Sequence, residues 1–260
     1  MTEDVDFPPK RSRPVEAWSG ILDRGGRLPA APLRAEVRVL FCFDGLMRVA
    51  TPAGHWFIPD RCGIWLPPGT APELDFSGRM EVQCFAIAPR FAARTGLPPR
   101  PAVLRATPLI RGAGRRLMPP TGQESPLGPA EARRLCWVLL DEIARLERPE
   151  LHLPGAGDPR LARVMARLMA HPAEAGNLAR LAQGVGSSER TLGRLFAQET
   201  GLGWRDWRDR LRLVLAVEGL QAGRSSTELA HWLGYSTPSA FVAAFRRQSG
   251  MTPGEWRRRA

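Results

Sequence analysis

The alternation of apolar and polar residues predicts short strands in the first third of the chain. Residues 36–43 alternate in part and are rich in β-branched and aromatic side chains. Asp44-Gly45, a hairpin signal, separates them from a second apolar stretch at 46–49. Further short apolar stretches lie at 56–58, 64–66 and 80–87, with prolines and glycines between them. Many short strands at this spacing predict a small β-sandwich or β-barrel.

Helical spacing of apolar residues replaces this alternation further along the chain. A helix is expected near 109–117 and another over 129–146, where Pro129 suits the first turn. Residues 151–159 are predicted to form a linker, and the rest of the chain is expected to be helical. The expected fold class is α+β, with an N-terminal β-barrel or sandwich followed by an all-α domain.

The last third of the chain contains one sequence pattern twice. The second copy follows the first by 48 residues up to a glycine (Gly186 and Gly234) and by 49 residues beyond it (Ser188 and Thr237). The first copy consists of Leu181-Ala182, Gly186, Ser188, Leu192, Phe196, Gly201 and Trp207-Arg208. The second consists of Leu229-Ala230, Gly234, Thr237, Phe241, Phe245, Gly250 and Trp256-Arg257.

Each copy predicts a helix-turn-helix unit. A short helix ends at a glycine, where a sharp turn needs backbone freedom. A hydroxyl residue, Ser188 or Thr237, then caps a second helix, and Gly201 or Gly250 ends that helix. The units are expected at about 178–200 and 227–250. A helix over 203–221 joins them, and its inward residues are expected to be Trp204, Trp207, Leu211 and Leu215.

Charge adds a candidate partner. The chain has 37 basic and 26 acidic residues, and residues 158–260 alone carry 16 arginines and nine acids. A positive domain suits a polyanion such as DNA, although a merely soluble basic surface is the alternative. In the first unit, Arg190 and Arg194 stand four residues apart beside Gly193. Arginine contacts guanine edges bidentately in the major groove, and a phosphate contact is the other possibility.

The corresponding face of the second unit is smaller and more apolar. It consists of Ser239, Val242, Ala243 and Arg246, which could contact a thymine methyl group or a sugar but offer no strong bidentate bond. Arg246 and Arg247 are expected to hold phosphates. The first unit should therefore carry most of the sequence specificity. The candidate DNA-binding residues are Ser188, Arg190, Gly193, Arg194, Thr237, Ser239, Val242, Ala243, Arg246 and Arg247.

These residues carry a resemblance to a known family. Residues 228–253, Glu-Leu-Ala-His-Trp-Leu-Gly-Tyr-Ser-Thr-Pro-Ser-Ala-Phe-Val-Ala-Ala-Phe-Arg-Arg-Gln-Ser-Gly-Met-Thr-Pro, are similar to the C-terminal signature of AraC/XylS transcription regulators. The resemblance implies a DNA-binding domain over 158–260. It also implies that the two units enter successive major-groove segments of promoter DNA, about 10 bp apart. Members are more often activators than repressors, which would make RNA polymerase a further partner.

The N-terminal part resembles the cupin-like effector domain of one branch of that family. The matching residues are 45–54, Trp56, Pro59 and 65–69, and the segment 151–160 also resembles that branch. The implied organisation is a flexible arm over 1–27, an effector domain over 28–90, and a linker over 91–157. Histidines common in that branch are missing, since 28–32 has no His-x-His pair and Pro72 stands where a histidine is usual. His55 remains, so no metal, cofactor or catalytic residue is expected.

Two further roles are expected of the N-terminal part, each with an alternative. The β-domain could hold a small effector, which the sequence does not identify. Helix 129–146 could pair two chains into a homodimer, or it could pack within its own chain. The possible lining residues are Phe41, Phe43, Trp56 and Trp65, unless these aromatics fill a closed core. The apolar positions of the helix are Leu135, Val138, Leu139, Leu140 and Ile143.

Several function classes are disfavoured. No run of 18 apolar residues exists and the first 14 residues are polar, so a cytoplasmic protein without a membrane partner is expected. The four cysteines form no C-x-x-C pair, although Arg61 beside Cys62 could activate that thiol for redox sensing. No nucleophile elbow or P-loop is present. The leading hypothesis is a DNA-binding transcription regulator. The alternatives are a regulator without ligand sensing and a cupin-type enzyme with an appended helical domain.

Overall fold

A computed structural model describes residues 14–22, 25–30, 36–118 and 127–259. In these residues ten antiparallel strands form two five-stranded sheets. Sheet A has the order β1-β8-β3-β6-β9, and sheet B has the order β10-β5-β4-β7-β2. The strands are β1 (Val15–Leu22), β2 (Gly26–Leu28), β3 (Val37–Phe43), β4 (Leu46–Thr51), β5 (Gly54–Ile58), β6 (Cys62–Leu66), β7 (Glu73–Ser77), β8 (Met80–Ile87), β9 (Ala102–Arg105) and β10 (His152–Pro154).

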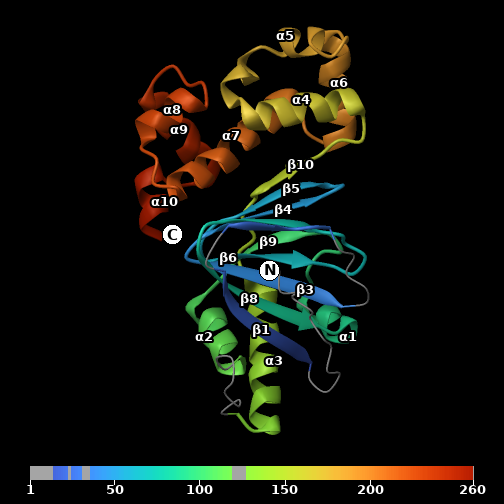
Figure 1. Cartoon of the computed structure of the whole chain (residues 1–260), viewed down its shortest axis with the longest axis vertical. Helices are drawn as coiled ribbons and strands as arrows, with labels where there is room; N and C mark the ends of the chain where they lie inside the picture. Colours follow the sequence, from blue (N-terminus) through green and yellow to red (C-terminus); the bar gives the residue numbers. More distant parts are fainter. Residues whose placement is uncertain (1–13, 23–24, 31–35, 119–126, 260) are drawn as a thin grey trace.

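The helices lie on both sides of this sandwich (Figure 1). Helices α4 to α10 occupy one end of the molecule, and α2 and α3 lie at the opposite end against sheet A. The helices are α1 (Pro89–Ala92), α2 (Pro108–Leu117), α3 (Pro129–Arg145), α4 (Pro159–Ala170), α5 (Leu178–Gln183), α6 (Glu189–Thr200), α7 (Trp204–Gln221), α8 (Ser226–Trp232), α9 (Pro238–Ser249) and α10 (Pro253–Arg259).

Strand β3 shows why the sheets need cover on both faces. Leu40 and Cys42 point between the two sheets, and their cluster continues into the helical domain through residues such as Trp207. Val39 and Phe41 belong to a second cluster, which α2 and α3 cover. Because both faces are buried, β3 is almost continuously apolar rather than strictly alternating.

The α+β architecture is confirmed, with an open two-sheet sandwich rather than a closed barrel. The strands predicted from residue 36 onward are present as β3, β4, β5, β6 and β8. The hairpin predicted at Asp44-Gly45 is wrong, because β3 belongs to sheet A and β4 to sheet B. Asp44 does adopt a left-handed turn conformation with φ of 63°, and this turn carries the chain from one sheet to the other.

The predicted domain limits also need correction. The arm proposed for 1–27 is wrong for 15–22, which form β1 and pair with β8 along their whole length. Residues 1–13 lie outside the described residues. The linker proposed for 91–157 is wrong as well, because β9 extends sheet A and β10 extends sheet B. The β-rich domain therefore continues far beyond residue 90, as far as β10.

Helix α3 packs mainly within its own chain. Leu139, Leu140 and Ile143 are buried in the cluster beneath sheet A, and Leu135 packs against its edge. Val138 is 46% exposed. The alternative of packing against the β-domain thus accounts for four of the five apolar positions.

Candidate nucleic-acid interface

The first helix-turn-helix unit consists of α5 and α6. Asn177 caps α5 by accepting a hydrogen bond from Arg180 N at 2.9 Å. Gly186 then takes a left-handed conformation (φ 65°) in the turn. Ser188 caps α6, its Oγ accepting from Thr191 N at 3.2 Å, and Gly201 (φ 70°) ends that helix. The turn and the caps predicted for this unit are confirmed.

The second unit repeats the arrangement with α8 and α9. Ser225 and Glu228 form a capping box at the start of α8. Gly234 (φ 74°) makes the turn, and Thr237 Oγ1 accepts from Ala240 N at 3.1 Å to cap α9. Gly250 (φ 77°) ends α9. Local hydrogen bonding thus fixes both units in the same way.

The inward faces of α6 and α9 are anchored by matching aromatic contacts. Phe196 of α6 packs on Trp207 with ring centroids 5.2 Å apart. Phe245 of α9 packs edge-on against Trp256 at 5.8 Å. Trp207, Leu211 and Leu215 of α7 are buried as predicted, and Trp204 is half-buried. Both recognition helices therefore sit on one continuous core, with their opposite faces outward.

The outward face of α6 presents two arginines. Arg190 and Arg194 are exposed, and Gly193 lies half-buried between them. Neither guanidinium has an ion pair or hydrogen bond with another described residue, whereas Arg160, Arg167 and Arg210 each pair with a carboxylate. Five donors on each unpaired guanidinium are therefore available to an external acceptor.

The outward face of α9 borders an open groove of about 750 Å³. Its lining combines small and apolar side chains with two arginines that are exposed. Ser188 and Thr237, also predicted to contact DNA, serve as helix caps in the structure. The lining residues are Pro238, Ser239, Val242, Ala243, Arg246, Arg247, Gly250 and Thr252.

Helix α7, which joins the two units, also contacts the β-domain. Trp207 Nε1 donates to Pro154 O of β10 at 2.9 Å. Glu218 of α7 forms an ion pair with Arg48 of β4. Arg105 of β9 lies over the Trp256 ring, 5.5 Å from its centroid. The sequence analysis missed these contacts, because no local pattern links residues as far apart as Arg48 and Glu218.

A small cavity lies between the two sheets, but its walls differ from the prediction. Its volume is about 60 Å³, and Arg38 is the charged residue among its apolar lining. The lining is Trp18, Leu22, Leu28, Arg38, Leu40, Leu66, Pro72, Leu74, Phe76, Val82 and Cys84. Phe41, Phe43 and Trp65 instead fill the core beneath sheet A, and Trp56 stacks on His152 with centroids 4.4 Å apart. The closed-core alternative holds for all four aromatics.

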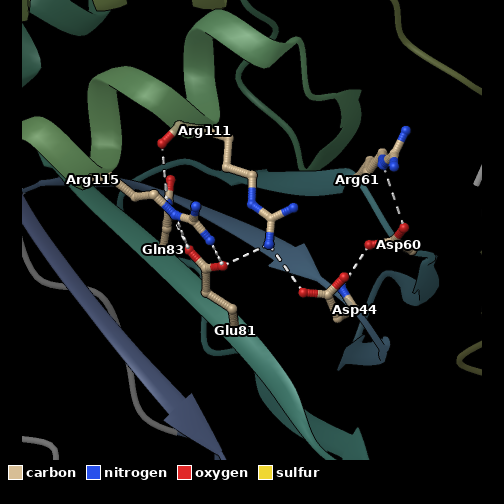
Figure 2. Close-up of polar contacts among 7 residues, drawn as sticks. All are labelled: Asp44, Asp60, Arg61, Glu81, Gln83, Arg111 and Arg115. Carbon is tan, nitrogen blue, oxygen red and sulfur yellow. Dashed lines mark hydrogen bonds and ion pairs between the residues drawn. The ribbon is translucent and has the colours of Figure 1, made fainter.

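The densest polar cluster fastens α2 to sheet A (Figure 2). Arg111 Nη2 donates to Glu81 at 2.7 Å and to Asp44 at 3.0 Å, and Arg115 donates to Glu81 at 2.8 Å. Burial alone would raise the pKa of Glu81, but hydrogen bonds from Arg115, Arg111 and Gln83 lower it to about 2. Glu81 is therefore a permanently ionised anchor at neutral pH.

The remaining titratable candidates are inert or dispersed. Cys62 is buried, and burial raises the pKa of its thiol to about 12, which opposes the redox role considered for it. Burial also lowers the pKa of His55, which is half-buried on β5. In the described residues, no three His, Cys, Asp or Glu side chains are grouped to hold a metal ion. A search of the same residues finds no helix long and apolar enough to cross a membrane.

Known proteins share this arrangement of helices. The helix-turn-helix domain family matches residues 181–259. The transcriptional regulator NimR of Escherichia coli K12 is 31% identical over 222 residues, covering 84% of this chain and 78% of NimR. A putative AraC-like regulator of Streptomyces lividans is 35% identical over 134 residues, covering 49% of this chain and 44% of its own. The DNA-binding domain of AdpA, solved with a target DNA, is 32% identical, covers 38% of this chain and 91% of that domain, and has a TM-score of 0.36.

Two capped helix-turn-helix units on one core define a DNA-binding transcription regulator. The chain belongs to the AraC-type family of helix-turn-helix regulators. The family match covers the C-terminal domain, and the cupin-like character of the N-terminal domain stays a prediction.

Proposed function

We propose that this regulator recognises promoter DNA mainly through α6, while α9 enters the next major-groove segment. The observation that carries this proposal is the pair of exposed, unpaired guanidinium groups of Arg190 and Arg194 on a capped helix. A bidentate contact between arginine and guanine discriminates by about 1–3 kcal/mol. Two such contacts give the first unit most of the specificity. The proposed function needs no catalytic residue, and its DNA target implies action in the cytoplasm.

A pair of double variants tests this division of labour. Arg190→Ala with Arg194→Ala should weaken binding to a preferred duplex by about a hundredfold, two contacts' worth, and leave binding to unrelated duplexes much less changed. The matched control is Arg246→Ala with Arg247→Ala. It should weaken binding to all duplexes alike and reduce the dependence of affinity on salt, by about one in slope for each phosphate contact. Unchanged sequence preference in the first variant would refute the proposal.

A homodimer is proposed through the helices at the far end of the β-domain. Leu109 of α2 and Val138 of α3, each 46% exposed, are two of the three large exposed apolar side chains in the described residues. α2 and α3 pack together and share a hydrogen bond from Thr107 to Glu142 at 2.6 Å. Sedimentation should show a dimer that Leu109→Asp with Val138→Asp converts to a monomer. A wild-type monomer at all concentrations would contradict this.

Effector sensing is proposed through the cavity between the sheets, with α7 as the contact to the DNA-binding units. The cavity volume of about 60 Å³ is far below the usual ligand pocket of about 300–1,000 Å³, so it must open to admit a typical effector. This size favours the second candidate, a regulator without ligand sensing. A thermal-shift screen of small apolar compounds separates the two, since a ligand that binds the folded state raises its stability.

Activation is proposed as the direction of regulation, with RNA polymerase as the partner. Transcription in vitro with purified polymerase tests it directly. More RNA from a promoter carrying the preferred site would support activation, and less RNA would show repression.

A further inference from the structure

The two recognition helices can be compared position by position. The internal repeat aligns α6 with α9 at an offset of 49 residues, as in Ser188 with Thr237 and Gly201 with Gly250. At the three outward positions α6 carries Arg190, Gly193 and Arg194, and α9 carries Ser239, Val242 and Ala243. The same surface therefore offers long cationic donors in one unit and short, mostly apolar groups in the other.

The groove on α9 gives these short side chains a defined setting. Val242 is half-buried, with one side packed against the hydrophobic core, so its outward side is fixed rather than mobile. Ala243 beside it is exposed. Arg246 and Arg247 lie one turn further along the same helix, and both are exposed at the border of the groove. An apolar floor with a cationic border suits a segment of DNA whose phosphates lie at that border.

The chemistry of the major groove selects what this floor can contact. Purines and cytosine present hydrogen-bond donors and acceptors there, and the thymine C5-methyl group is the apolar group. A donor or acceptor pressed against Val242 and Ala243 would lose its hydrogen bonds with water and gain none. A methyl group in the same place gains the free energy of leaving water. Thymine is therefore the base that this surface favours.

We infer that α9 recognises thymine methyl groups through Val242 and Ala243, so that the second half of the DNA site is thymine-rich. Arg246 and Arg247 hold the adjacent phosphates and carry no base information themselves. This inference rests on the proposed function and specifies the base chemistry of its second unit. The regulator then uses two different modes, with guanidinium contacts to guanine in one half-site and apolar contacts to thymine in the other.

Uracil substitution tests the inference, because it removes the methyl group and leaves base pairing intact. The probe is a duplex selected from a random library by the full chain. Replacing thymines of the second half-site by uracil should weaken binding about fourfold for each contacted methyl group, from the transfer free energy of one methylene. The same replacement in the first half-site should leave affinity unchanged. Equal affinity for the thymine and uracil duplexes, or a selected second half-site without thymine, would overturn the inference.

Two variants complete the test. Val242→Thr keeps the shape of the side chain and adds a hydroxyl, so it should reduce the discrimination between thymine and uracil without altering the melting temperature. Ser239→Arg with Ala243→Arg gives α9 the cationic pattern of α6 and should shift the selected base from thymine towards guanine. Unchanged base preference in both variants would also overturn the inference. Failure of the proposed function is distinguishable, because then no sequence would be enriched from the library at all.

Discussion

Gly186 and Gly234 occupy equivalent turns of the two helix-turn-helix units, and replacing each by alanine should have unequal consequences. Both residues are left-handed, with φ of 65° and 74°. A Cβ atom at Gly186 would have no neighbour within 4 Å. At Gly234 it would lie 2.9 Å from Ala173 Cα and 3.1 Å from Ala173 O. These neighbours are backbone atoms, so no side-chain rotation relieves the overlap.

The magnitudes follow from this geometry. The left-handed conformation costs an L-residue about 1–2 kcal/mol, and the stiffer unfolded chain returns about 0.4–1 kcal/mol. Gly186→Ala should therefore lower the free energy of unfolding by about 1 kcal/mol. Gly234→Ala adds the overlap with Ala173, which at the cost of overpacking is about 1–3 kcal/mol. The expected loss at Gly234 is about 2–4 kcal/mol in total.

Urea unfolding of the full chain, followed by far-ultraviolet circular dichroism, compares the two variants under the same conditions. Gly234→Ala should also weaken DNA binding more than Gly186→Ala does, because the displaced turn positions α9. Equal losses of stability in the two variants would refute the reasoning. So would a Gly234→Ala protein as stable as the wild type.

Three other predictions concern groups outside the DNA interface. The pKa of Glu81 is lowered from 4.5 to about 2, so its contribution to stability is present above pH 4.5 and is lost as the pH falls towards 2. Unfolding free energies across that range should fall more steeply for the wild type than for Glu81→Gln, and parallel curves would contradict the role of the Arg111–Arg115 cluster. Cys42, Cys62 and Cys84 are buried with raised thiol pKa values, so a thiol reagent should label them only after unfolding; stoichiometric native labelling of Cys62 would restore the redox interpretation. A double-mutant cycle on Arg48→Ala and Glu218→Ala should give a coupling of about 0.5–1 kcal/mol in unfolding free energy, and no coupling would show that this partly exposed pair does not join the domains.

The helical domain could be predicted from sequence because its determinants are local. The glycine turns and the Ser188 and Thr237 caps depend on residues a few positions apart, and the repeat shows each of them twice. The order of strands in the β-domain depends on contacts between distant segments. β1 pairs with β8 and β10 pairs with β5, and neither partner can be recognised from the short strand itself. At Asp44-Gly45 the turn chemistry was right and the strand pairing was wrong for the same reason.

The candidate site divides along the same line. Arg190, Arg194, Val242 and Ala243 were placed on outward helix faces by periodicity, and the structure finds them exposed or half-buried there. The supposed ligand-lining aromatics were misjudged, because β3 is buried on both faces. Alternation alone does not tell the face between the sheets from the face beneath α3.

Selection of duplexes from a random DNA library by the purified chain tests the central claim most directly. The account predicts an enriched site with two half-sites about 10 bp apart, with guanine in one and thymine in the other. Binding that enriches no sequence and falls steeply with salt would show that the arginines hold phosphates alone, and would contradict it.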